Sequence, residues 1–185
     1  MVKKIDRRKR YTRYALKQSL MTLLENKPIS NITVKEICML ADINRSTFYA
    51  HFSDQYDLLA KIEEEIIKDL HSYLERFKLE EDKMTVKLLE YIEDNQKTFQ
   101  ILLNKNRESG FETKLKSVAK QFMMNHWLDG VDHQLESKYL STFVISGAIH
   151  VIKDWLLNGM DVSKDDMAMM INRFIKNGLS YLDDL

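Results

Sequence analysis

Apolar residues recur every three or four positions along most of this 185-residue chain, a spacing that predicts amphipathic helices. One Pro and five Gly leave few places where such helices would be interrupted. We therefore predict an all-α fold of about nine helices, one for each apolar stripe. The stripes lie within residues 11–26, 33–41, 45–52, 54–77, 84–94, 98–103, 111–127, 137–157 and 163–182.

Two short helices joined by a tight turn are predicted within residues 33–52. Thr33 can cap the first helix, and Glu36 can accept a hydrogen bond from the backbone N–H of the capping residue. Ile32 and Ile37 can pack against each other beside this capping box. Local chemistry therefore fixes the start of the first helix.

The second of these helices has an apolar side and a polar side. Residues 42–44 have the composition of a turn, and Asn44 can cap the helix that follows. Phe48 and Phe52 are four residues apart, so both face inward. The side chains left to face outward are Arg45, Ser46, Thr47, Tyr49 and His51. A short helix of this kind suits insertion into the major groove of DNA.

The helix expected next, residues 54–77, is long. Asp54 can cap it, and Asp57 lies in its first turn. Its length is roughly 24 residues, or about 36 Å. It leaves the helix-turn-helix and enters the larger remainder of the chain. It is therefore the natural lever between the two.

The helix-turn-helix resembles that of the tetracycline-repressor (TetR) family of bacterial transcription regulators. Asp42 stands where the family often has Gly, and Gln55 stands where it often has Lys. The loss of that Lys puts one phosphate contact in doubt but not the fold. Residues 155–160, WLLNGM, are similar to a C-terminal subfamily found mainly in Gram-positive bacteria. The N-terminal resemblance is carried by Thr33, Ile37, Ala41, Ile43, Ser46, Phe48, Tyr49, His51, Phe52, Asp54 and Leu58.

The resemblance implies a DNA-binding domain over residues 1–53 and a regulatory and dimerisation domain over residues 54–185. Arg45 is a candidate for reading guanine, and it could equally bind a phosphate. Tyr49 and His51 match phosphate-contacting positions of the family. The full set of expected DNA contacts is Thr33, Arg45, Ser46, Thr47, Tyr49, His51, Arg8 and Arg10.

Charge supports a nucleic-acid partner. The chain has no net charge, yet residues 1–50 carry 11 Lys/Arg against 4 Asp/Glu, so an acidic body follows a basic front. Residues 1–10 are basic and lack an apolar face, so we expect a mobile arm there. The arm either binds phosphates or the minor groove, or is simply a solvated tail.

The C-terminal body offers a possible effector pocket and a dimer interface. Met and aromatic residues at helical spacing usually form plain core, but they also permit a small-molecule pocket, whose candidate lining is Phe99, Leu103, Phe122, Met123, His126, Trp127, Phe143 and His150. Gly147 and Gly178 fall in mid-helix, where close approach of a partner helix would explain them. The expected homodimer interface is Phe143, Gly147, Val151, Trp155, Ile171, Phe174 and Gly178.

The sequence carries no sign of catalysis, a metal site or a cofactor. It has no G-x-S-x-G, P-loop or G-x-G-x-x-G motif, and no two His are three or four residues apart. The single Cys38 fits a reducing cytoplasm, and we expect no signal peptide and no apolar run of the ~20 residues that span a membrane.

These features together predict a cytoplasmic, non-enzymatic transcription regulator. We expect a homodimer that binds a palindromic operator, represses transcription and is released by a ligand or a partner bound in the C-terminal domain. The alternatives are an activator, or an interaction module whose C-terminal domain docks a partner protein.

Overall fold

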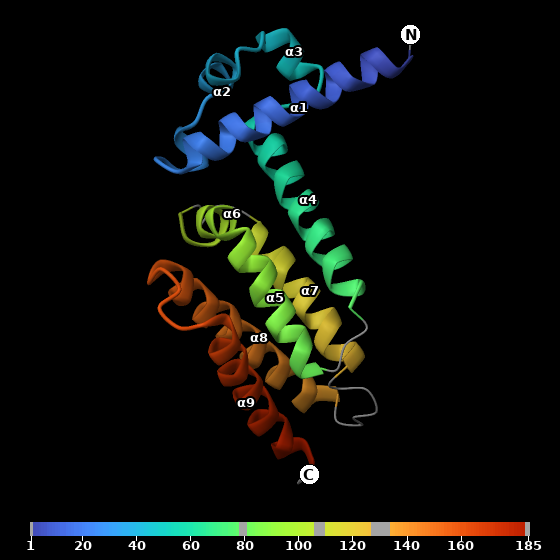
Figure 1. The fold of residues 1–185 in the computed structure, drawn as a ribbon, viewed down its shortest axis with the longest axis vertical. Coiled ribbons are helices and arrows are strands. Elements are labelled where there is room, and N and C mark those ends of the chain that lie inside the picture. The colour runs from blue at the N-terminus through green and yellow to red at the C-terminus, as the bar shows by residue number, and fades with distance from the viewer. Residues whose placement is uncertain (1, 78–80, 106–109, 127–133, 184–185) are drawn as a thin grey trace. The chain divides into compact units, whose positions relative to one another are not determined.

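A computed structural model describes residues 2–77, 81–105, 110–126 and 134–183. The described chain is all-α, as predicted, with nine α-helices and two short helical turns (Figure 1). The helices are α1 (Val2–Leu24), α2 (Val34–Ala41), α3 (Arg45–Tyr49), α4 (Gln55–Glu75), α5 (Glu81–Asp94), α6 (Gln96–Gln100), α7 (Phe111–His126), α8 (Gln134–Leu157) and α9 (Lys164–Asp183). The turns are a 3₁₀ turn, η1 (Ile29–Asn31), and a π-helical turn, η2 (Ile101–Lys105).

The chain divides into two compact units. Unit 1 comprises residues 1–66 and 101–110, and unit 2 comprises residues 67–100 and 111–185. The division falls inside α4, whereas the sequence placed a domain boundary between residues 53 and 54. Unit 1 is therefore discontinuous in sequence.

Unit 1 is built on α1. This helix packs against α2 and against η2, and the Lys105 ammonium donates a hydrogen bond to the Glu25 carbonyl at 3.1 Å. The core of the unit is aliphatic and aromatic, and its members are almost fully buried. They include Leu16, Leu20, Leu24, Ile29, Ile32, Ile37, Phe48, Phe52, Leu58 and Leu59.

The N-terminal residues differ from the prediction. A mobile arm was expected over residues 1–10, but α1 begins at Val2 and is 23 residues long. Lys and Arg are good helix formers, and a helix that is already nucleated extends readily through them without an apolar face. Apolar periodicity therefore could not detect this part of the helix.

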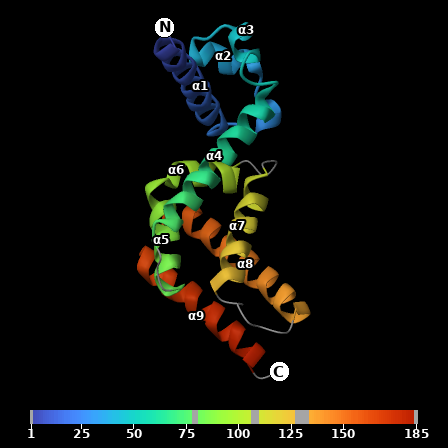
Figure 2. The same ribbon diagram turned by 90° about the vertical axis from the view of Figure 1, so that its right-hand side faces the viewer.

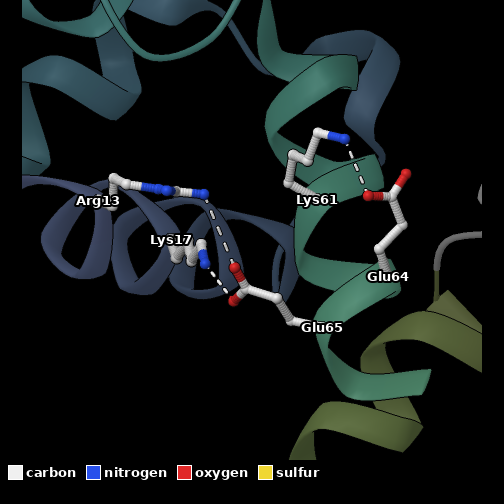
Figure 3. Close-up of polar contacts among 5 residues, drawn as sticks. All are labelled: Arg13, Lys17, Lys61, Glu64 and Glu65. Carbon is white, nitrogen blue, oxygen red and sulfur yellow. Dashed lines mark hydrogen bonds and ion pairs between the residues drawn. The ribbon is translucent and has the colours of Figure 1, made fainter. Parts of the chain in front are cut away.

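The α4 helix is fixed at its start and tied to α1 within unit 1. The Asp57 N–H donates to the Asp54 carboxylate at 2.8 Å, which confirms the predicted cap. Figure 3 shows Glu65 of α4 reaching α1, where it pairs with the Lys17 ammonium and, at 3.9 Å, with the Arg13 guanidinium. One carboxylate thus holds two cations of α1.

Unit 2 contains α5 to α9, gathered into one bundle (Figure 2). The α5 helix packs against α9, and α8 packs against α6, α7 and α9. Phe99 lies between Tyr91 and Phe111, with ring centroids 6.0 Å and 5.5 Å away, both edge-on. These contacts join α5, α6 and α7 around one aromatic cluster.

The connection between α8 and α9 is fixed by a left-handed turn, a helix cap and one indole hydrogen bond. Gly159 and Met160 adopt left-handed backbone angles, with φ of 73° and 59°. The Asp166 N–H donates to the Ser163 hydroxyl oxygen at 3.1 Å and caps α9. The Trp155 indole N–H donates to the Val162 carbonyl at 2.8 Å, so the turn is anchored to α8.

The α8 helix corrects the expectation about apolar runs. Its residues 138–157 are long and apolar enough to cross a membrane by length and composition alone, with a mean hydropathy of 1.3. Only 33% of that window is buried. One side of α8 packs within unit 2, while Tyr139, Phe143 and Leu157 stay exposed among polar residues, so apolar residues occur on more than one side of the helix.

We expect the ion pairs of Glu112 to make stability depend on acid pH. Hydrogen bonds from Lys116 and Lys153, both at 2.8 Å, lower the pKa of Glu112 from 4.5 to about 2. A lowered folded-state pKa adds stability that is complete above the unfolded pKa and is lost as pH falls toward the folded value. Glu112→Gln should therefore lose less stability than the parent between pH 5 and pH 2, as measured by urea midpoints. An unchanged acid dependence would contradict this, and Lys153→Met should reproduce the effect in part.

Candidate nucleic-acid interface

The start of α2 is held by the predicted capping box. The Glu36 N–H donates to the Thr33 hydroxyl oxygen at 3.3 Å, and the Thr33 N–H donates to the Glu36 carboxylate at 2.9 Å. The Lys27 ammonium, 2.6 Å from the same carboxylate, is the main reason that the pKa of Glu36 falls to about 2. This box leaves Thr33 exposed at the N-terminal end of α2.

The turn between α2 and α3 depends on a left-handed residue. Asp42 has φ of 53°, and the following Ile43 N–H donates to the Cys38 carbonyl at 3.0 Å. Glycine adopts this conformation without strain, and Asp is among the few other residues that tolerate it. The geometry therefore accounts for the Gly that the family often has at this position.

Asn44 then starts α3, as the sequence predicted. Its side-chain oxygen accepts from the Ser46 N–H at 2.9 Å and from the Ser46 hydroxyl at 3.0 Å. The Ser46 hydroxyl is thus already used as a donor. It would have to rotate away from Asn44 to donate to a phosphate.

The inner side of α3 is confirmed as core. Phe48 is completely buried, Phe52 is nearly so, and their ring centroids are 5.8 Å apart. Tyr49 is 58% exposed, and its ring lies edge-on to Phe48. Phe48 therefore sets the direction in which α3 presents its other face.

The outer side of α3 carries the side chains expected to meet DNA. Arg45 and Ser46 are exposed, as is Tyr49, and Thr47 is half-buried. The α3 helix ends at Tyr49, so it is shorter than the expected helix within residues 45–52. His51 is half-buried in the turn that follows, although the Phe52 N–H still donates to the Phe48 carbonyl at 2.9 Å.

Other basic and aromatic side chains are exposed in unit 1. Arg8 and Arg10 are exposed on α1, and so are Tyr11 and Tyr14, which the sequence reading did not single out. Lys35 of α2 borders the same surface hollow as Arg45. The position of Lys35 just after the Thr33 cap could have identified it, because the first turn of a helix in this motif faces the phosphates.

Unit 2 contains a partly open apolar cavity of about 130 Å³. Of the eight expected lining residues, Phe122 and Met123 border it. Phe99 is buried in the aromatic cluster instead, and Leu103 is buried in η2 of unit 1. The side chain of His126 and all of Trp127 lie outside the described residues.

Phe143 and His150 were also expected at the pocket, and there the structure disagrees. Both are exposed on α8, while Ile145, Ile149 and Ile152 face the cavity. Helical periodicity correctly separates these two faces of α8. It does not tell which apolar face turns toward the chain's own interior.

The expected dimer residues also divide. Phe143, Gly147 and Phe174 are exposed, and Val151 is half-buried. Trp155 and Ile171 were expected at the interface, but both are buried within their own chain. Trp155 anchors the α8–α9 turn, and Ile171 lines the cavity. Gly178 lies outside the residues whose burial the structure describes. Tyr139 and Met170, not predicted, are exposed beside Phe143 and Phe174 at helical spacing.

The helix-turn-helix has a buried inner side and an exposed outer side that is polar and basic, and a separate helical unit surrounds a cavity. This combination defines the class of helical transcription regulators. Residues 80–177 match a family model described as "Transcriptional regulator C-terminal region", which covers more than half of the chain. The chain belongs to the TetR family of transcriptional regulators, a non-enzymatic family.

Several relatives resemble the chain at low identity. YxbF, an uncharacterized HTH-type transcriptional regulator of Bacillus subtilis (strain 168), is 24% identical over 114 residues, which are 57% of this chain and 29% of YxbF. DhaS, the HTH-type dhaKLM operon transcriptional activator of Lactococcus lactis subsp. lactis (strain IL1403), is 23% identical over 166 residues, 83% of each chain.

Solved structures show the same fold. A TetR transcriptional regulator from Streptococcus agalactiae 2603V superposes with a TM-score of 0.77 at 22% identity, covering 98% of this chain and 99% of that one. The structure of the dihydroxyacetone kinase operon activator DhaS gives a TM-score of 0.62 at 19% identity, covering 92% and 97%.

Proposed function

We propose that the chain binds a palindromic operator as a homodimer and represses transcription until an effector in unit 2 releases it from DNA. The geometry of α3 supports the proposal that the chain binds DNA. Burial of Phe48 and Phe52 turns Arg45 and Tyr49 to the outside, where a major groove can receive them. The exposed arginines of α1 add cations for the flanking phosphates.

Exposed aromatic residues of α8 and α9 support the homodimer. Phe143 is 79% exposed and Phe174 is 68% exposed, which is unusual for aromatic residues with no partner to cover them. A Cβ added at Gly147 would meet nothing within 4 Å in the single chain, so its surface is open for close approach of another helix. Two such helices from each of two chains would pack as a four-helix interface.

Regulation follows from the spacing that a dimer needs. The two recognition helices must lie about one DNA turn apart, roughly 34–36 Å, to enter successive major grooves. An effector that binds more tightly to the conformation with one spacing of the recognition helices shifts the protein toward that conformation. The shift changes the affinity of the protein for DNA. The α4 helix is the proposed lever, because it is continuous between unit 1 and unit 2. We place this activity in the cytoplasm, in keeping with a single buried thiol, Cys38, and with DNA as the partner.

Arg45→Ala should weaken specific operator binding by about 1–3 kcal/mol, or about 5- to 150-fold, because the variant loses a bidentate donor to a base or a contact to phosphate. The measurement is a mobility shift with the promoter upstream of the chain's own gene, at several salt concentrations. Lys120→Ala is the matched control, since it removes one exposed cation from unit 2. Unchanged operator affinity in Arg45→Ala would remove Arg45 from recognition, and no shift of the parent protein at low salt would reject the proposed function.

Activation is the second candidate, because the relative DhaS is named as a transcriptional activator. Deleting the gene distinguishes the two modes. Transcripts from the regulated promoter should rise if the protein represses and fall if it activates. If unit 2 instead docks a partner protein, that partner should co-purify with the full chain. It should co-purify equally well with the Arg45→Ala variant.

A further inference from the structure

The cavity of unit 2 is bordered almost entirely by hydrocarbon. Five helices contribute to its wall, namely α4, α5, α7, α8 and α9, and 17 of its 18 lining side chains are apolar. No charged side chain is among these described residues. A volume of about 130 Å³ is close to that of apolar protein cavities of about 150 Å³ that stay dry and bind benzene.

Thr85 is the one polar residue in the lining. Its hydroxyl donates to the side-chain oxygen of Asn172 at 2.5 Å, and Asn172 is buried. The Thr85 proton is therefore committed to Asn172, while the lone pairs of its oxygen remain able to accept. The wall can thus satisfy one hydrogen-bond donor of a ligand, such as an alcohol hydroxyl.

A charged group does not fit this wall. Moving a carboxylate or an ammonium out of water without a partner costs far more than moving a hydroxyl, and the described lining offers no opposite charge. Met84 and Met123 border the space, and their unbranched side chains adapt to ligands of irregular shape. The wall therefore selects by charge more strongly than by shape.

We propose that the effector is an uncharged, mainly hydrocarbon molecule of about six to eight carbon atoms that carries at most one hydroxyl group, placed at Thr85. This inference rests on the proposed function for its regulatory meaning, but binding itself does not. Leu70 and Leu74 of α4 line the cavity, so the ligand touches the helix that continues into unit 1. Occupation of the cavity therefore acts on α4 directly.

Calorimetric titration of the full chain with 1-octanol and with octanoate at neutral pH tests the ligand class. The alcohol should bind at least about tenfold more tightly than the carboxylate, because only the carboxylate must bury an unpaired charge. Thr85→Val should weaken binding of 1-octanol several-fold and leave binding of toluene unchanged, since toluene makes no hydrogen bond.

Two variants locate the ligand. Ala148 and Ala119 both line the cavity, and Ala148→Leu fills part of it, with Ala119→Val as a smaller change should the first variant fail to fold. Each folded variant should bind 1-octanol at least about tenfold more weakly. Ala15→Leu, at a half-buried position of α1 that does not line the cavity, is the matched control and should bind like the parent.

Three results would overturn the proposal: octanoate binding as tightly as 1-octanol, neither ligand binding, or unchanged 1-octanol affinity in both filling variants. A mobility shift with operator DNA and no ligand tests the proposed function separately from the proposed ligand class. If the operator does not bind but 1-octanol binds in the cavity, the ligand class stands and the regulatory role falls. If the operator binds and octanoate is preferred, the regulatory role stands and the ligand class falls.

Discussion

Phe143→Glu should convert the proposed homodimer to a monomer and abolish high-affinity operator binding. Phe143 is 79% exposed in the single chain, so the substitution does not disturb the interior of unit 2. An interface with two-fold symmetry contains this residue twice. If each copy contributes about 2 kcal/mol, as central aromatic residues of interfaces do, the dimer weakens by about 4 kcal/mol, or about a thousandfold. Sedimentation velocity at micromolar concentration measures this directly.

Met39→Glu is the control for Phe143→Glu in sedimentation. Met39 is 70% exposed, similar to Phe143, but it lies on α2 in unit 1. Its replacement should leave the oligomeric state unchanged. A Phe143→Glu variant that still sediments as the dimer would show that this side of α8 is not the interface, and a parent protein that sediments as a monomer would reject the homodimer itself.

Phe48→Ala should destabilise unit 1 by about 3–5 kcal/mol, because it removes a completely buried ring and leaves a cavity under the helix-turn-helix. Operator binding should fall with it, since Phe48 positions α3. No tryptophan occurs within residues 1–66 or 101–110, so tryptophan fluorescence would miss this loss. Amide hydrogen exchange in α2 and α3 is the suitable measurement.

Tyr49→Phe separates packing from DNA contact at the same site. It keeps the ring that lies edge-on to Phe48 and removes only the exposed hydroxyl, so exchange in α2 and α3 should stay at the parent level. Phe48→Leu should show an intermediate loss. Parent-like exchange in Phe48→Ala would contradict a structural role for this ring.

Local chemistry determined what the sequence could predict well. The cap at Thr33, the turn at residues 42–44 and the cap at Asp54 depend on side chains within four residues of each other. Their hydrogen bonds therefore appear in the sequence as spacing. The inward positions of Phe48 and Phe52 follow from the same short-range geometry.

Long-range packing determined what the sequence could not predict. The α8 helix is apolar on several sides, so its periodicity did not show that Phe143 and His150 leave the cavity or that Trp155 stays inside. The α1 helix shows the opposite problem, because residues 2–10 are helical without any apolar stripe. Only contacts between distant segments resolve such cases.

The discontinuity of unit 1 limits how this protein can be recombined with its relatives. Residues 101–110 belong to unit 1, and η2 packs on α1 through a turn whose Ile101, Leu102 and Leu103 are all buried. A chimaera that grafts only residues 1–66 onto another regulator's body would replace this turn with a foreign one. Exchange of operator specificity among such proteins should therefore succeed when the segment 101–110 travels together with the helix-turn-helix.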